Sequence, residues 1–386
     1  MAGYAVQLAG PHRFAQLARG HGVLYEPLPD DFLALCETDE SHRALLCGLL
    51  LNGRFARHIH ALIDELLRSE WRAAHIFRPH LIVYHPKSIA SPHMVERIGC
   101  RSIFASPLPV HTPTSAFPTP SVPWRTIGPL NRISHTVVEQ YFERAFRKPI
   151  LNWRRKTLGL PERPRGRHAP DRKLYAYSRH LVPTPKDWGE HIHVTGAWWL
   201  EEPDRRLPAE LETFLSVGVP PVCVTLAGIP ERLAHDLACA AIGAGRMLGK
   251  RVVFATAGRS VGNLRSPDVF ALDDVPLNQV LSRVDTIFHH GQAATTAAAL
   301  RAGRPSAIYR ALSEGRFWAR RIHDFGAGPP PIEVKSLSVE QMTALMSAMD
   351  TPFVRDNVRQ LSSQIRDEGG IDDAVRVIEQ LDRVGR

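Results

Sequence analysis

VDTIFHHGQAATTAAALRAGRPSAIYR, residues 284–310, places a strand, a tight loop, a helix, a turn and a second strand in direct succession. Val284 to Phe288 is a short apolar run with β-branched residues, which is typical of a buried parallel strand. Thr295 and Thr296 open an alanine-rich run that ends before Gly303, a residue suited to the position after a helix C-terminus. The order of these signals predicts a helix that follows the strand after only a short loop.

The loop between this strand and this helix predicts an anion site. The first backbone N–H groups of a helix have no partner within the helix, and the helix dipole places partial positive charge at the same end. His289, His290 and Gly291 stand directly before that end. We therefore expect the loop to bind a phosphate group.

The segment HHGQAATTAAALRAG resembles the HHGGAGTT signature of GT-B fold glycosyltransferases that use a nucleotide-diphosphate sugar. Further segments resemble the bacterial, sterol glucosyltransferase-like branch of this UDP-glycosyltransferase family, in the same order along the chain. They are HPKSIASPHMVERIG, PTSAFPTP, LYAYSRHLVPTPKDWGEHIHVTGAWWLEEP, LSVGVPPVCVTLAGIP and FALDDVPLNQVLSRVDTIFHHG. The resemblance covers nearly the whole chain, and several ordered motifs are more specific than one.

The resemblance implies an α/β protein with the GT-B fold, in which two Rossmann-like doubly wound domains face a cleft. We expect an N-terminal acceptor-side domain over residues 1–194 and a C-terminal nucleotide-sugar-binding domain over residues 195–370. Residues 371–386 should form a helix that packs back on the first domain. In the second half, the alternation of apolar runs and helical segments itself predicts a parallel sheet with right-handed crossovers.

Apolar periodicity and turn residues also predict the individual elements. In the first half, strands are expected at 4–8, 23–28, 81–86 and 102–110, and helices at 12–20, 45–70, 93–98 and 135–156. In the second half, further strands are expected at 222–228, 252–256, 268–272 and 306–310, and a helix at 231–248. A long Pro-rich loop is expected over 107–129, and long loops in compact domains are usually functional or mobile. In the resembled family such a loop borders the acceptor cleft; the alternative is that its aromatic residues, Phe117 and Trp124, only cap the core.

The family pattern implies a donor site. Its second histidine lies on the pyrophosphate and the backbone that follows cradles the phosphates, which implies these roles for His290 and for Ala294 and Thr295. Glu314 stands where the family has the acid of a sugar-binding Asp-Gln pair, and Val275 matches a segment that meets the nucleotide base. The implied donor-binding residues are Gly228, Val275, His290, Gly291, Ala294, Thr295, Thr296, Glu314 and Gly315.

Several positions depart from that pattern. Gln292 and Ala294 replace glycines, which narrows the loop because glycine alone permits close backbone approach and positive φ without strain. Gly315 replaces the glutamine of the sugar-binding pair, and Ala227-Gly228 replaces a Gly-Ser that would offer a hydroxyl to a phosphate. Together these changes indicate an altered donor site.

The residues from Tyr4 to Leu8 match the second strand of the family's first domain. A first strand, a loop close to GSRGDVQP and a first helix should come before it, and no residue of the sequence matches them. That strand is central in a doubly wound sheet, so we expect an incomplete N-terminal domain with a gap in its sheet. The unmatched loop carries the Asp or His that deprotonates the acceptor, so the catalytic residues are unknown from the sequence.

Composition sets further limits. A chain of 386 residues with 44% hydrophobic and 23% charged residues is typical of a globular protein with two domains. It contains neither a signal-peptide pattern at its start nor a run of roughly 18 apolar residues, so a cytoplasmic location is expected. Five scattered cysteines without a CxxC pair indicate reduced thiols. The net charge of +9 is spread along the chain, except for one basic cluster, RPRGRHAPDRK at 163–173. This cluster is either a solvated loop or a contact for phosphate or an anionic membrane.

We therefore expect a hexosyltransferase that moves sugar from a UDP- or dTDP-sugar co-substrate to a hydroxyl of a lipid-like or polycyclic acceptor, with inversion. The expected partners are the nucleotide-sugar donor, a hydrophobic small-molecule or lipid acceptor and, peripherally, a membrane. No cofactor or metal is expected, because no HExxH motif or carboxylate cluster is present. The main alternative is a catalytically inactive homologue that acts as an auxiliary or binding subunit. A nucleic-acid-binding protein rests on net charge alone and is not expected.

Overall fold

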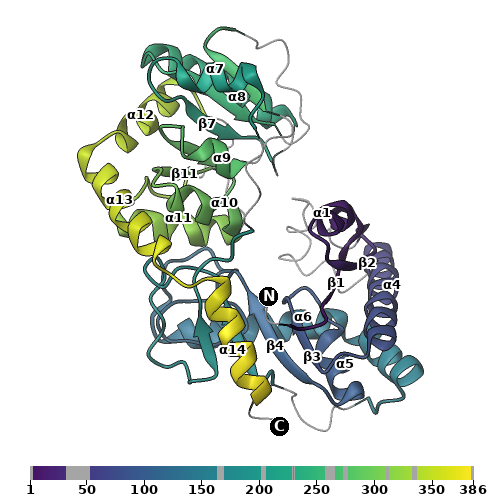
Figure 1. Ribbon diagram of the computed structural model, residues 1–386. Coiled ribbons are helices and arrows are strands. Elements are labelled where there is room, and N and C mark those ends of the chain that lie inside the picture. Colours follow the sequence, from purple (N-terminus) through teal and green to yellow (C-terminus); the bar gives the residue numbers. More distant parts are fainter. Residues whose placement is uncertain are drawn as a thin grey trace.

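The computed structural model describes residues 3–31, 53–162, 169–200, 206–227, 229, 231–256, 266–272, 277–309, 313–332 and 337–383. Figure 1 shows two lobes, one built by residues up to 194 and one by residues 195–370, here called the N-terminal and C-terminal halves. The last helix, α14 (Ile371–Arg383), returns from the C-terminal half and lies along the N-terminal lobe. In the part of the chain described, no helix is long and apolar enough to cross a membrane.

The main sheet of the N-terminal half has four parallel strands in the order β3-β4-β5-β6. Its centre is β4, whose residues from Ser102 onward are all buried and in which Ile103 pairs with Val83 on one side and Arg172 on the other. Its β-branched Ile103 and aromatic Phe104 suit such a strand. The strands are β3 (Leu81–Tyr84), β4 (Arg101–Ser106), β5 (Arg172–Tyr175) and β6 (Ile192–Val194).

Two further strands, β1 (Gln7–Pro11) and β2 (Leu24–Leu28), pair in parallel with each other and join no other described strand. The 3₁₀ turn η1 (His12–Phe14) and helix α1 (Ala15–Gly20) connect them. Figure 1 places this unit beside α4 and apart from β3 and β4. The described strands of this half thus form two separate sheets.

The helices of the N-terminal half enclose a core of their own, in which Ile63, Leu67, Met94 and Trp153 are buried together. Helix α5 begins with a proline in its first turn and stops at Gly99, whose φ of 76° is the left-handed conformation of a helix C-cap. The helices are α4 (Gly53–Phe77), α5 (Ser91–Ile98), η3 (Gly128–Leu130), α6 (Asn131–Trp153) and the π-helical η4 (Arg154–Leu158).

The C-terminal half contains one five-stranded sheet, in the order β11-β10-β7-β8-β9 with every pair parallel. Every residue of β7 is buried, because helices cover both faces of a parallel sheet. The strands are β7 (Val222–Thr225), β8 (Val252–Ala255), β9 (Val269–Leu272), β10 (Ile287–His289) and β11 (Ser306–Ile308).

The helices of this half begin and end at residues suited to those positions. Ser338 and Gln341 form a capping box at the start of α12, and Thr351 caps α13 before Pro352. The helices are α7 (Ala209–Ser216), α8 (Glu231–Met247), α9 (Leu277–Leu281), α10 (Ala293–Arg301), α11 (Ser313–Phe325), α12 (Val339–Met349) and α13 (Pro352–Arg366).

The two predicted boundaries nearest the loop need correction. Strand β10 is shorter than expected and includes His289, which is fully buried rather than part of the loop. Helix α10 begins at Ala293, so Thr295 and Thr296 lie inside its first turn and cap nothing. Its N-cap is Gln292, which makes no side-chain capping bond. Gly303 follows the helix with the expected positive φ, 68°.

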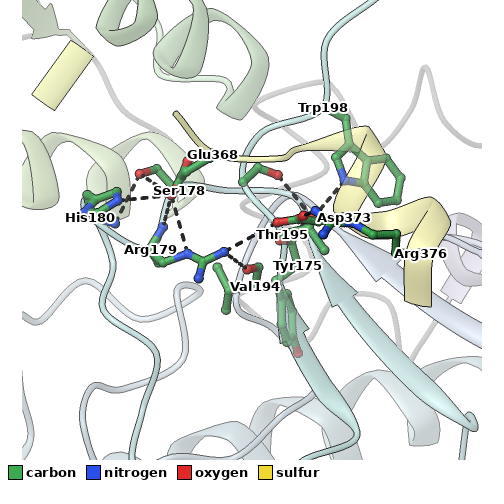
Figure 2. Close-up of polar contacts among 11 residues, drawn as sticks. Tyr175, Ser178, Arg179, His180, Val194, Thr195, Trp198, Glu368, Asp373 and Arg376 are labelled. Carbon is green, nitrogen blue, oxygen red and sulfur yellow. Dashed lines mark hydrogen bonds and ion pairs between the residues drawn. The ribbon is translucent and has the colours of Figure 1, made fainter. Parts of the chain in front are cut away.

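The chain passes between the halves at two places that touch each other (Figure 2). Residues 195–198 leave the N-terminal half, and the turn before α14 crosses them: Gly370 N donates to Thr195 O at 2.8 Å. In that turn the buried carboxylate of Glu368 accepts from Ser178 Oγ at 3.0 Å and from Arg179 N at 2.9 Å. These contacts join the two crossing segments into one polar cluster.

Candidate functional site

The loop from His290 to Gln292 lies at the carboxyl end of β10, where open parallel sheets bind their ligands. Gly291 has a φ of 88°, and a side chain there would come within 2.5 Å of Gly315 Cα. Glycine is therefore required at Gly291 both by its backbone conformation and by the close approach of α11. Two of the sequence-predicted residues, far apart in the chain, are packed directly against each other.

Of the backbone amides at the start of α10, two have a hydrogen-bond acceptor and two do not. Ala293 N donates to Glu314 Oε1 at 2.9 Å, and Thr296 N donates to Gln292 O at 2.9 Å. Within the described residues, no acceptor is present for the amides of Ala294 and Thr295. Their donors lie at the positive end of the α10 dipole and are suited to an anion.

His290 stands beside these amides. Both of its ring nitrogens are buried, and neither has a hydrogen-bond partner at normal geometry among the described residues. Burial lowers the pKa of His290, and the nearby Gln292 side chain opposes that shift. The ring is thus neutral near neutral pH and carries one N–H that is suited to donating to a ligand.

His289 has a different environment, although the sequence motif pairs it with His290. Its ring is fully buried, and its Nδ1 accepts from Gly291 N at 3.2 Å. Burial lowers the pKa of His289 to about 3, so it stays neutral and holds the loop. The first histidine thus holds the loop by a hydrogen bond, whereas the ring nitrogens of the second are buried without one at normal geometry.

Glu314 reaches the loop from α11. Burial raises the pKa of its carboxyl, while the hydrogen bond from Ala293 N and the charge of Lys87 oppose this. Its carboxylate therefore lies on the first amide of the helix, next to the position in which the sequence predicts a phosphate.

Lys87 comes from the N-terminal half, and the sequence analysis did not include it. It lies in the loop after β3, where Lys87 N donates to His85 Nδ1 at 3.1 Å. The next residue, Ser88, donates its hydroxyl to the buried Glu70 at 2.6 Å. The sequence did contain a signal for Lys87: it follows directly after the predicted apolar strand at 81–86. The carboxyl ends of parallel strands meet at the edge of the sheet where ligands bind.

The two halves share a hydrophobic core under this loop. Tyr177 and Leu181 of the N-terminal half pack with Leu300 and Trp318 of the C-terminal half. A cavity of about 20 Å³, the size of one water molecule, lies between them and is bordered by Thr296. Thr296 is therefore buried at the junction, and its hydroxyl has no partner among the described residues.

The predicted acceptor loop also meets the C-terminal half. Phe117 is buried against Phe317 with ring centroids 5.9 Å apart, and the Arg321 guanidinium lies 4.9 Å from the Phe117 ring. Trp124, by contrast, is 58% exposed. Gly228, Val275 and most of the basic cluster at 163–173 lie outside the described residues. No group of His, Cys, Asp and Glu side chains that could hold a metal ion is found within the described part of the chain.

Comparison with known proteins adds the following. Residues 244–370 match the family model of the erythromycin biosynthesis protein CIII-like C-terminal domain. The chain is 27% identical to sterol 3-beta-glucosyltransferase UGT80A2 of Arabidopsis thaliana, over 97% of this chain and 60% of that protein. It is 30% identical to the O-mycaminosyltylonolide 6-deoxyallosyltransferase of Streptomyces fradiae, over 70% of this chain and 66% of that protein. The chain thus spans less than two thirds of the length of these relatives.

Solved structures give the same fold. The glycotransferase of kitacinnamycin superposes with a TM-score of 0.70 at 18% identity, over 98% of this chain and 92% of that one. Spinosyn rhamnosyltransferase SpnG complexed with thymidine diphosphate superposes with a TM-score of 0.64 at 16% identity, over 98% of this chain and 93% of that one. At these identities the likeness establishes the arrangement of the chain.

Proposed function

The chain belongs to the UDP-glycosyltransferase family with the GT-B fold, and from this we propose that it transfers a hexose from a UDP- or dTDP-sugar to a hydroxyl of a lipid-like or polycyclic acceptor. The relatives are named for sterol and macrolide-type acceptors, and one structural neighbour holds thymidine diphosphate. Residues 1–194 would supply the acceptor side and residues 195–370 the donor side of such a reaction.

One observation supports the proposal: three donors at or next to the start of α10 have no acceptor at normal hydrogen-bond geometry among the described residues. They are the amides of Ala294 and Thr295 and the neutral imidazole of His290. A buried donor without an acceptor, such as that of His290, costs about 1–3 kcal/mol unless a ligand satisfies it. Ala294 is exposed and Thr295 is half-buried, so a ligand can reach their amides. A diphosphate supplies several acceptor oxygens in one group.

The proposed reaction is a direct displacement with inversion. The acceptor oxygen forms a bond to the anomeric carbon, the bond from that carbon to the diphosphate breaks, and the hydroxyl proton passes to a base. The α10 amides and His290 would stabilise the negative charge that grows on the departing diphosphate, as donors fixed in advance. No described residue is assigned as the base.

Glu314 is proposed to bind hydroxyls of the transferred sugar. It is buried at the loop, carries an acceptor-only carboxylate when ionised, and uses one oxygen on Ala293 N. Its second oxygen would accept from the sugar, while the diphosphate uses the next two amides of the helix.

The test of the donor site is His290→Ala, with UDP and dTDP titrated by calorimetry. A hydrogen bond to a charged group is worth about 1.5–3 kcal/mol, so we expect roughly ten- to hundredfold weaker binding. His235→Ala, an exposed histidine on α8 in the same half, is the matched control and should bind as the parent does. Equal affinity of His290→Ala and parent would remove His290 from the site.

Glu314→Ala separates the sugar from the diphosphate. We expect weaker binding of the sugar nucleotide and unchanged binding of the free nucleoside diphosphate, measured in the same titration. Equal losses for both ligands would show that the residue acts on the loop instead. Tighter binding of the free diphosphate would show that the carboxylate competes with phosphate for the helix amides.

The alternative function is that of a non-catalytic auxiliary subunit, and the position of Glu314 favours it, because an internal carboxylate already occupies the first helix amide. Nucleotide release from UDP- and dTDP-sugars with a panel of hydrophobic alcohols distinguishes the two functions. Binding without turnover by any donor and acceptor pair would support the auxiliary subunit. A cytoplasmic location and a peripheral membrane contact remain parts of the proposal.

A further inference from the structure

A second cavity lies at the other end of α10, away from the His290 loop. It has a volume of about 420 Å³ and opens between the C-terminus of α10 and one face of α13. Arg304, Arg359 and Arg366 line it, together with Ser363 and a single acid, Asp367. The lining therefore contains three guanidinium groups and one carboxylate, and Arg359 also pairs with Asp356 outside the lining.

The positions along α13 explain why these side chains meet. Arg359, Ser363 and Arg366 are spaced by four and three residues, so they lie on one face of the helix. All three are exposed. Helix α13 packs against α10, and this face is brought next to Arg304, which follows α10.

Arg304 is the most buried of the three arginines. Its Nη2 donates to Ser282 O, but its Nε is buried without a partner among the described residues. Burial lowers the pKa of Arg304; Asp285 opposes this, whereas Arg355 and Arg366 lower it further. Asp285 is already engaged by Lys250, at 2.6 Å, and by Arg355. Lys250 and Arg355 also pair with Asp350, so among the described residues these two carboxylates are taken up by other cations and the guanidinium of Arg304 has no ion pair.

Capping of α10 accounts for part of this arrangement. Arg366 Nε donates to Arg301 O at 3.1 Å and Ser362 Oγ donates to the same carbonyl at 2.6 Å, as suits the negative end of a helix. Capping does not explain the buried, unpartnered Nε of Arg304. Nor does it explain Arg359, whose nearest acid is Asp356 on its own helix at 2.6 Å.

We propose that this cavity binds the phosphate group of a phosphomonoester. Arginine forks match phosphate oxygens in pairs of hydrogen bonds, and a phosphate dianion balances the excess of cations. The hydroxyl of Ser363 adds a further donor at the rim. A volume of about 420 Å³ exceeds that of a phosphate alone and leaves room for the group that the phosphate is attached to.

The experiment uses the full chain with His290→Ala in every protein, so that the donor loop contributes little to phosphate binding. Inorganic phosphate and glycerol 3-phosphate are titrated by calorimetry at constant ionic strength. Arg359→Gln with Arg366→Gln should weaken binding at least roughly tenfold, because two charged hydrogen-bond donors are lost. Arg147→Gln with Lys148→Gln, two exposed cations on α6, removes the same charge and should leave binding unchanged.

A second variant keeps the test decisive if the double substitution harms folding. Ser363→Glu places a negative charge at the cavity rim and should abolish phosphate binding, while the exposed site tolerates the change. Cosedimentation with phosphatidylcholine vesicles, with and without phosphatidic acid, then distinguishes a lipid phosphomonoester from a soluble one. Binding of phosphate that none of the cavity substitutions weakens, or that the control pair weakens equally, would overturn the proposal.

Discussion

The two halves of the molecule build their parallel strands in different ways. In the C-terminal half five strands form one sheet, and the strand β7 is buried along its whole length. In the N-terminal half the described strands form two sheets, and β1 and β2 pair only with each other. Large apolar side chains are exposed at this pair: Leu8 on β1 at 50%, Leu24 on β2 at 60%, and Val6 directly before β1 at 63%.

This difference shows that pairing alone does not bury a strand. Both β1 and β9 are edge strands with one partner each, yet Leu272 on β9 lies in a core with Val280 and Leu281, whereas Leu8 on β1 lies in no hydrophobic cluster of the described residues. Apolar burial, not the ladder of hydrogen bonds, supplies most of the favourable free energy of folding. We therefore expect the two halves to differ in stability.

The largest expected effect compares the same substitution on these two strands. Leu272→Ala removes a side chain that is 4% exposed and should lower the free energy of unfolding by about 2–5 kcal/mol. Leu8→Ala removes one that is 50% exposed and should change it by less than about 0.5 kcal/mol. Denaturant unfolding followed by circular dichroism measures both. Similar losses for the two variants would mean that β1 is packed in solution in a way its exposure does not show.

The same contrast explains which parts of the fold the sequence could predict. In the C-terminal half the five strands and the helices α8 and α10 follow from local patterns, since the strands are short, mostly apolar runs and the two helices are followed by Gly249 and Gly303. Helices α7, α9, α11, α12 and α13 were not predicted. In the N-terminal half, β3, β4 and α5 were also predicted with small boundary shifts. These elements depend mainly on residues close to each other in the chain.

The details of the site depend on residues that lie far apart in the sequence, and the predicted start of helix α10 was wrong. Helix α10 begins at Ala293 rather than at the threonines, and the amide of that first residue is held by Glu314, 21 residues later. The requirement for glycine at Gly291 comes from α11, and the charge of Lys87 comes from the other half. A pattern of neighbouring residues contains none of these contacts. The role of His290 at the phosphate stays a prediction from the motif.

The stability of the N-terminal half should also depend on pH. Glu70 of the N-terminal half is buried, and burial raises its pKa to about 7, although Ser88 and the Ala90 backbone donate to it and oppose the shift. The folded protein thus keeps a proton that the unfolded chain releases near its ordinary value of 4.5. The free energy of unfolding should therefore fall by about 3 kcal/mol as pH rises from about 4.5 to about 7.

Glu70→Gln isolates this effect, because glutamine accepts from Ser88 but does not ionise. The variant should exceed the parent in stability at roughly pH 8 and lose that advantage near pH 5. Thermal melts of both proteins across this range give the measurement. An advantage that does not change with pH would show that Glu70 does not titrate on unfolding.

The smallest effect has the opposite sign and belongs to the C-terminal half. Arg246 Nε donates to Asp268 at 2.7 Å, and Ser266 donates to the other oxygen; these bonds lower the pKa of Asp268 to about 2, while partial burial opposes them. Because the folded pKa is depressed below the ordinary value of 3.8, the stabilisation is present above about pH 4 and is lost as pH falls toward 2. Both side chains are partly exposed, at 59% for Arg246 and 31% for Asp268, so water screens the pair.

Asp268→Asn should lower the Tm at neutral pH by less than about 2 °C, and less still in high salt. A loss that salt does not reduce would mean that Asp268 acts through its position beside β9, between Ser266 and Val269, rather than through its charge. Of these two acids, Glu70 would then be the one whose titration changes stability with pH.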